Sequence, residues 1–263
     1  MKRTACALLL LVCFSTAARS AAPIAVRVLT YNIHHGEGTD GRFDLPRVAA
    51  LISAAAPDLV ALQEVDQRTA RAGGGNQLAE LERLTGMHGL FGKAMDFQGG
   101  AYGVAVLTRQ PVARAMNRAL PARPGREPRT GLTVDVRTRP DGPLLHFTST
   151  HLDQGRDQEH RLAQAGFLND VLATNGDMPG ILAGDMNSRP DTDVMQLLAG
   201  RWLASFPDLP PVAPDRPRGL VDHVLARPVE DWHASETRVI DDRLASDHRP
   251  LLVVLEWSPP ATR

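Results

Sequence analysis

The chain has 263 residues, of which 43% are hydrophobic and 22% charged, an ordinary globular composition for one large domain or two small ones. Its formal net charge of −1 gives no global basic field that would draw it to nucleic acid or anionic membranes, although a local basic patch remains compatible with this total. Both cysteines, Cys6 and Cys13, lie near the N-terminus. The rest of the chain therefore has no disulfide, cysteine nucleophile or cysteine-rich zinc site.

Residues 1–22 have the layout of a secretory signal peptide. Lys2 and Arg3 precede an apolar run over residues 5–14, and small residues follow up to Ala22. The run is too short to span a bilayer comfortably, and no later segment approaches the roughly 20 apolar residues that a transmembrane helix needs. We expect an exported protein, periplasmic or secreted, whose residues 23–263 form a single domain that acts as a monomer.

The first part of the remaining chain alternates strands and helices. Strands are predicted over residues 24–32 and 58–65 from their continuous apolar character. A helix is predicted over residues 45–56, with Asp44 as its N-cap, and another over residues 76–86, where a glycine ends the pattern.

The middle of the chain changes to short β-rich runs separated by glycine and proline, which predict antiparallel hairpins. The last part repeats the opening alternation of helix and strand. Two halves of similar design predict two mixed β-sheets packed face to face, with helices on the outer faces. The β-rich runs cover residues 102–109, 112–120, 130–138 and 144–152; the later helices cover residues 157–173 and a segment from about 191, and the later strands cover 180–186, 220–226 and 250–257.

Acidic, amide and histidine side chains recur where these predicted strands begin or end. Such residues are also common in ordinary turns, so any one of them alone indicates little. Their repetition next to strong hydrophobes indicates a site, because a carboxylate there needs a partner or a cation and because sites assemble at strand ends. In chain order they are Asn32, His34, His35, Gln63, Glu64, His151, Asp185, Asn187, Asp222, His223, Asp247 and His248.

The residue types favour a particular chemistry. Asn32, Glu64 and Asp247 offer hard oxygen ligands without thiolate, which suits Mg²⁺ or Mn²⁺ and leaves room for water and a phosphate oxygen. His151 and His248 are able to hydrogen-bond a phosphoryl group, and a neighbouring carboxylate would fix the tautomer of an imidazole.

These motifs together resemble the endonuclease/exonuclease/phosphatase superfamily, which includes pancreatic-type deoxyribonucleases, apurinic endonucleases, bacterial sphingomyelinases and inositol polyphosphate phosphatases. The resemblance spans roughly residues 26–256 and implies an α/β fold, a four-layer α/β sandwich. It rests on the ordered segments TYNIHHG, LQEVD, YGVAVLTR, THLD, GDMNSRP, VDHV and SDHRPLL.

The resemblance also implies the site. Glu64 matches the central metal-binding carboxylate, with Asn32 and Asp247 beside it as further ligands of Mg²⁺ or Mn²⁺. The mechanism it implies is in-line attack of water on phosphorus, with the developing charge neutralised by the metal and by imidazolium.

The resemblance assigns the remaining catalytic roles to five side chains. Asp185 looks like the residue that orients or deprotonates the attacking water, and Asn187 like its partner on the phosphate. Because they are two residues apart, we expect both to project to one side of an extended segment. His151 matches the histidine that contacts the scissile phosphate, and His248 matches a histidine that serves as base or as electrostatic clamp, held by Asp222.

Three further residues are candidate substrate contacts. His34, with His35, either lines the site or forms a solvated turn. Arg129 either binds phosphate or is an ordinary exposed arginine. Tyr102 is expected near the site by family position, although Val104 stands where the motif often carries Asn.

Other polar and aromatic residues are predicted to be structural. His223 points away from its neighbour on a strand and is expected in the core or on the surface. Arg161 is expected to be structural, and Trp202, Trp232 and Trp257 are expected in the core.

Three kinds of function fit this pattern. The chain length and neutral charge favour an exported phosphoesterase acting on a small or lipid-linked phosphate ester. A secreted nuclease acting on DNA or RNA is the alternative, and its signature would be clustered lysine and arginine with a steep salt dependence. A binding module that kept the fold without its chemistry is disfavoured by the full set of catalytic residue types. The motifs do not name a substrate.

Overall fold

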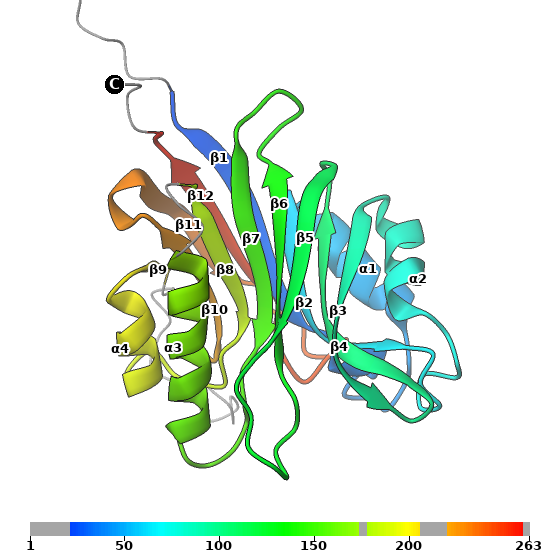
Figure 1. The fold of residues 1–263 in the computed structure, drawn as a ribbon. Helices are drawn as coiled ribbons and strands as arrows, with labels where there is room; N and C mark the ends of the chain where they lie inside the picture. The colour runs from blue at the N-terminus through cyan, green and yellow to red at the C-terminus, as the bar shows by residue number, and fades with distance from the viewer. Residues whose placement is uncertain (1–21, 174–177, 206–219, 260–263) are drawn as a thin grey trace, which may run out of the picture.

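The computed structural model describes residues 22–173, 178–205 and 220–259. They form a four-layer α/β sandwich of two six-stranded mixed sheets with helices on the outer faces, as expected (Figure 1). The predicted signal peptide lies outside the described residues, except for Ala22. Within the described ranges, no helix has the length and apolar character needed to cross a membrane.

The first sheet has the strand order β11-β12-β1-β2-β4-β3. Its only parallel pair within the described residues is β1 with β2, at the centre of the sheet. The strands are β1 (Ile24–Asn32), β2 (Leu59–Gln67), β3 (His88–Phe97), β4 (Gly100–Thr108), β11 (Trp232–Val239) and β12 (Leu251–Trp257).

The second sheet has the order β5-β6-β7-β8-β10-β9, again with a parallel pair, β7 with β8, at its centre. In register, His151 lies opposite Asp185 and Asp185 lies opposite Asp222. The central strands of this sheet therefore bring three predicted site residues side by side. The strands are β5 (Val112–Ala119), β6 (Thr130–Arg137), β7 (Leu144–His151), β8 (Gly180–Asp185), β9 (Leu203–Ser205) and β10 (Asp222–Arg227).

Three hydrophobic clusters hold the layers together. The largest fills the space between the sheets with side chains such as Val28, Phe147 and Val253. A second joins α1 (Leu45–Ala55) and α2 (Gln77–Thr85) to the outer face of the first sheet, and a third joins α3 (Glu159–Ala173) and α4 (Asp193–Ala199) to that of the second. The three tryptophans, Trp202, Trp232 and Trp257, are buried as predicted.

Two predicted helix ends are confirmed, at Asp44 before α1 and at Gly86 after α2. Asp44 caps α1 by accepting a hydrogen bond from the backbone N–H of Arg47, and Asn76 caps α2 through Ala79 in the same way. Gly86 ends α2 in the left-handed conformation that glycine adopts without strain.

The strands that the sequence did not indicate are β3, β9 and β11. β3 and β11 are the two edge strands of the first sheet, and β9 is an edge strand of the second. Most residues of β3 and β11 are partly or fully exposed, so their hydrophobic pattern is weak. Pairing with a neighbouring strand, rather than intrinsic preference, makes these segments extended.

We predict that Gly184→Ala destabilises the protein. A Cβ atom at Gly184 would lie 2.0 Å from the carbonyl oxygen of Thr150 on β7, and backbone would have to move to relieve this clash. We expect a loss of about 2 kcal/mol or more in the free energy of unfolding, measured by thermal or denaturant unfolding.

The matched control is Gly166→Ala on α3, where an added Cβ meets no atom within 4 Å. This change should raise stability by up to about 1 kcal/mol, because alanine favours the helix. Equal stability of the two variants would show that β7 and β8 are not packed as described.

Candidate active site

Asn32 connects the two sheets at the ends of their central strands. It is the last residue of β1, and its Nδ2 donates to Oε1 of Glu64 at 3.0 Å and to Oδ2 of Asp185 at 3.2 Å. Glu64 lies on β2 of the same sheet, whereas Asp185 ends β8 of the other. One side-chain amide therefore brings together the carboxylates that the sequence assigned to metal binding and to catalysis.

Asp185 is buried, with 1% of its surface exposed, and lies between two imidazoles. Its Oδ2 is 3.4 Å from Nε2 of His151 and 3.6 Å from Nε2 of His248. Burial and the charge of Asp222 raise the pKa of Asp185, although His248 and the backbone N–H of Asn187 act in the opposite direction. A carboxyl group with a raised pKa is suited to accept a proton from water.

Asn187 lies beside Asp185 and His151, but not on an extended segment as the sequence analysis expected. The segment is not extended, because Asn187 has a φ of 46° and its backbone N–H donates to Oδ1 of Asp185 at 2.8 Å. Its Nδ2 donates to the carbonyl of Leu152 at 2.9 Å and lies 3.0 Å from Nε2 of His151. A tight turn, rather than alternation along a strand, places Asn187 beside Asp185.

His248 is held by Asp222 as the sequence predicts, with 2.9 Å between Nδ1 and Oδ2. Burial by itself lowers the pKa of this imidazole, but the carboxylates of Asp222, Asp185 and Asp247 together raise it to about 10. At neutral pH, His248 therefore carries a positive charge beside Asp185.

The sequence did not indicate the role of Ser246, although it belongs to the same SDH motif. Its buried Oγ donates to the carbonyl of Asn32 at 2.7 Å and accepts the backbone N–H of His248 at 3.1 Å. Ser246 thus fixes the position of His248 relative to β1. The presence of a serine at this position of the sequence does not by itself predict these contacts.

Glu64 has an unusual backbone conformation. It lies in a β-bulge of β2, between Leu62 and Val65, with a φ of 57° that few residues other than glycine adopt. Burial would raise the pKa of its carboxyl group, but His35 and the amide of Asn32 hold that pKa well below its usual range. Glu64 is therefore a fixed negative charge at the site.

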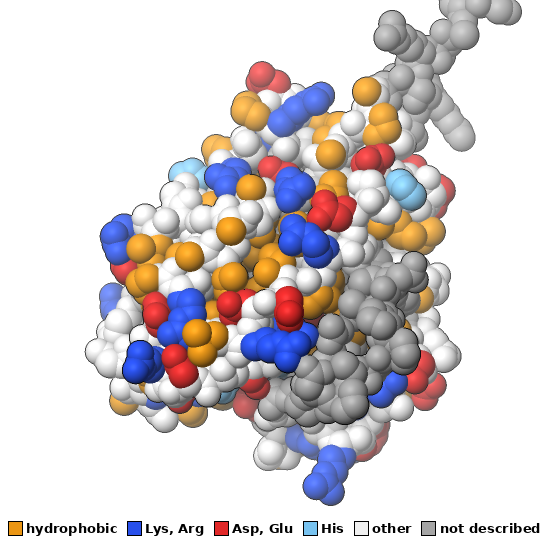
Figure 2. All heavy atoms as spheres, turned by 180° about the vertical axis from the view of Figure 1, so that it is seen from behind, with side chains coloured by type: hydrophobic (Ala, Val, Ile, Leu, Met, Phe, Trp, Pro, Cys, Tyr) orange, Lys and Arg blue, Asp and Glu red, His pale blue; other side chains and the backbone are white. Residues whose placement is uncertain are grey.

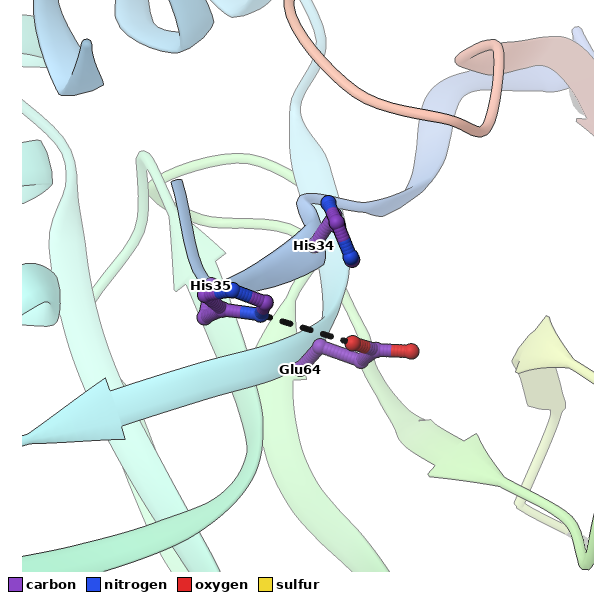
Figure 3. A group of neighbouring side chains, drawn as sticks. All are labelled: His34, His35 and Glu64. Carbon is purple, nitrogen blue, oxygen red and sulfur yellow. Dashed lines mark ion pairs between the residues drawn. The ribbon is translucent and has the colours of Figure 1, made fainter. Parts of the chain in front are cut away.

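His34 and His35 lie beside Glu64 rather than in a remote turn (Figure 3). They belong to the short 3-10 helix η1 (His34–Gly36), and Nδ1 of His35 is 3.9 Å from Oε2 of Glu64. One ligand atom from each of the three side chains lies within 4.8 Å of the others. Gln77 on α2 supports this loop by donating to the carbonyl of His35 at 2.5 Å, a contact that sequence reasoning missed.

Asp247 is more exposed than the other expected metal ligands, Asn32 and Glu64. It is exposed, next to His248 in the segment before β12. Neither of the two clusters of potential ligands among the described residues includes it: one contains Glu64 with two histidines, and the other contains Asp185 with Asp222 and His248.

Arg129 and Tyr102 are buried rather than exposed. Nη1 of Arg129 lies 2.9 Å from Oε1 of Glu127 and 3.0 Å from Nδ1 of His151. Burial raises the pKa of Tyr102, and the charge of Glu64 raises it further. Arg129 therefore contacts a predicted site residue instead of being an ordinary exposed arginine, and Tyr102 lies near Glu64.

The contact with Arg129 favours one tautomer of His151. A guanidinium group only donates hydrogen bonds, so Nδ1 of His151 accepts and we expect the ring proton on Nε2. Nε2 faces an acceptor, Oδ2 of Asp185 at 3.4 Å, and also a second donor, Nδ2 of Asn187 at 3.0 Å. In this tautomer, His151 presents an N–H donor toward the carboxylate of Asp185.

Residues 29–248 match the sequence pattern of the Endonuclease/Exonuclease/phosphatase family. The chain belongs to this family. Members of the family are hydrolases that act on phosphate esters, and the match includes each of the side chains described above.

Solved structures of other members of the endonuclease/exonuclease/phosphatase family have the same fold. A protein of this family from Beutenbergia cavernae is 26% identical, with a TM-score of 0.74 over 91% of this chain and 74% of that chain. A mannosyl-6-phosphatase from Bacteroides thetaiotaomicron is 18% identical (TM-score 0.71; 88% of this chain and 99% of that chain). The human Nocturnin catalytic domain, with a bound sulfate anion, is 20% identical (TM-score 0.71; 89% and 94%). A search of curated proteins gives no significant match.

We predict that Arg129→Met changes the protonation pattern of His151. In the wild type, ¹⁵N NMR of the imidazole nitrogens should show a proton on Nε2 and none on Nδ1. Loss of the guanidinium donor should give a mixture of tautomers.

His146 is the internal control, because its Nδ1 faces a carboxylate, Oδ1 of Asp135, at 2.6 Å and should carry the proton in both proteins. An unchanged His151 spectrum in the variant would show that Arg129 does not fix the tautomer.

Proposed function

We propose that this protein is an exported, divalent-metal-dependent phosphoesterase that hydrolyses a phosphodiester or phosphomonoester by in-line attack of water. The observation that carries this proposal is the buried carboxylate of Asp185 between the imidazoles of His151 and His248. A general base next to two groups that donate to anionic oxygens is the arrangement that phosphoryl transfer to water requires. The export part rests on the signal-peptide pattern of residues 1–22.

The residues around Glu64 fit a divalent cation. Its carboxylate is ionised, fixed at one oxygen by Asn32, and 20% of its side-chain surface is exposed. The neighbouring imidazoles of His34 and His35 suit Mn²⁺ better than Mg²⁺, whereas the carboxylate suits both. Glu64, Asn32 and these histidines would hold the ion, with Asp247 as the further expected ligand. When bound, a divalent cation lowers the charge that develops on the phosphate oxygens.

The other side chains have separate roles in the proposed reaction. Asp185 orients the attacking water and accepts its proton. His151 donates from Nε2 to a non-bridging phosphate oxygen, and Asn187 provides an amide beside it. His248, kept positively charged by Asp222, stabilises negative charge on the phosphoryl group.

The charge distribution supports a substrate smaller than a nucleic acid. The net charge is −1, and acidic, basic and hydrophobic side chains are interspersed over the face shown in Figure 2. A nuclease gains affinity mainly from clustered positive charge that neutralises phosphates. We therefore favour a small or lipid-linked phosphate ester, with a secreted Mg²⁺-dependent nuclease acting on DNA or RNA as the alternative.

A parallel assay tests the reaction and the substrate class. The purified protein is incubated with Mg²⁺ or Mn²⁺ and plasmid DNA, RNA, sphingomyelin or an inositol phosphate, and product release is measured. We expect hydrolysis of a non-nucleic-acid ester, and a loss of at least about a thousandfold in kcat for Asp185→Ala because the general base is removed. Cleavage of plasmid by the wild type but not by Asp185→Ala would establish the nuclease function instead. A folded protein without any turnover would indicate a binding module.

Metal dependence has its own measurement. Binding of Mn²⁺ is followed by electron paramagnetic resonance, with activity measured before and after treatment with EDTA. We expect EDTA to abolish activity, and Glu64→Gln to weaken Mn²⁺ binding at least tenfold because a charged oxygen ligand is lost. Glu230→Gln, at an exposed glutamate of η2 (Val229–Asp231), is the control and should bind Mn²⁺ like the wild type. Equal Mn²⁺ affinity of both variants would contradict the assignment of Glu64.

A further inference from the structure

A hollow of about 940 Å³ lies next to the candidate active site, between the N-terminal ends of α1 and α2. This volume falls within the range of small-molecule sites. Residues from three segments line it: the η1 loop, the beginning of α1, and the loop that leads into α2. Those that matter below are Gly36, Phe43, Arg71, Gln77 and Ala79.

The hollow and the surroundings of Glu64 share the η1 loop, because Gly36 lines the hollow and His35 lies beside Glu64. The ring of Phe43 lies 5.8 Å from the ring of His35, and Nδ1 of His35 lies 3.9 Å from Oε2 of Glu64. Gln77 lines the hollow and also donates to the carbonyl of His35. A molecule bound at Glu64 therefore needs to extend past one side chain, His35, to reach the hollow.

Arg71 also connects the hollow to Tyr102, which is one of the predicted substrate contacts. Its Nε and Nη2 donate to the buried carboxylate of Asp66, at 2.6 and 3.0 Å, and its guanidinium lies over the rings of Phe97 and Tyr102. Among the described residues, Nη1 makes no hydrogen bond. Arg71 is thus a planar cation, held by Asp66, that lies over the ring of Tyr102 and also lines the hollow.

Phe43 is the feature that indicates the occupant. Its side chain is 51% exposed, the largest exposure of a large hydrophobic residue in the part of the chain that the structure describes. An exposed aromatic ring at the wall of a hollow that a guanidinium also lines offers a flat surface on which another ring is able to stack.

We propose that this hollow is a specificity subsite that binds a planar aromatic ring carried by the alcohol portion of the phosphate ester. The proposal rests on the proposed phosphoesterase function, with the reacting phosphate near Glu64 and Asp185. Because His35 lies between Glu64 and Phe43, a ring bonded directly to a phosphate oxygen does not reach the hollow. The ring must be separated from the ester oxygen by a spacer of several atoms.

Three diesters that share p-nitrophenol as leaving group test the subsite. Their second alcohol is 4-phenylbutanol, 4-cyclohexylbutanol or butanol, so only the planarity or presence of the distal ring changes. We expect kcat/KM for the phenylbutyl ester to exceed that for the butyl ester about tenfold, mainly through KM, and to exceed that for the cyclohexylbutyl ester as well.

Single substitutions test whether the preference for the phenylbutyl ester arises in the hollow. Phe43→Ala should remove most of the preference for the phenyl ring, and Phe43→Trp should retain it. Ala79→Phe, which fills the hollow from the exposed side of α2, should also remove it. Leu197→Ala is the control, because this exposed side chain lies on α4, which packs on the other sheet. This variant should prefer the phenylbutyl ester as strongly as the wild type does.

A binding measurement separates failure of the subsite from failure of the proposed function. Calorimetry compares 4-phenylbutylphosphonate with butylphosphonate, which requires no turnover. Tighter binding of the phenyl compound, lost in Phe43→Ala, supports the subsite even if none of the esters is hydrolysed. Equal affinities, or hydrolysis of the esters without preference for the ring, would overturn it.

Discussion

The hydrogen bonds donated by Asn32 are the interactions on which the site depends. Its amide bonds Glu64 on one side and Asp185 on the other, so a single side chain sets the separation of two carboxylates from different sheets. Two negative charges this close together would otherwise repel each other at a buried position. The sheets must therefore pack in one register for the site to form, and the apolar cluster between them supplies that register.

The backbone at the site is strained, whereas the core beneath it is regular. His34, His35, Glu64 and Asn187 all have a positive φ, which costs about 1 to 3 kcal/mol for each residue other than glycine. Such conformations persist only where their surroundings determine them: the bulge of β2 at Glu64, the hydrogen bond of Gln77 at the η1 loop, and the turn at Asp185. These conformations place His34 and His35 beside Glu64, and Asn187 beside Asp185.

The two carboxyl groups of the site have pKa values shifted in opposite directions, lowered at Glu64 and raised at Asp185. Around Glu64, nearby imidazoles and an amide favour the ionised carboxylate, which suits cation binding. Around Asp185, burial and a second carboxylate favour proton uptake, which suits a base. Environments that push two carboxyl groups in opposite directions assign them different roles. The hollow at Phe43 adjoins the first group, so the proposed ring-binding subsite extends the site on the side of Glu64.

The sequence by itself determined the two-sheet architecture, the capped helices and most of the polar residues of the site, because strand periodicity, capping residues and ordered motifs are local signals. It did not determine the edge strands β3, β9 and β11, whose extended conformation depends on pairing with their neighbours. Nor did it determine that a turn brings Asn187 to Asp185, that Arg129 is buried against His151, or that Ser246 links β1 to His248. Only the tertiary structure decided these contacts, because each joins residues whose distance depends on backbone conformation and on the packing of one strand or sheet against another.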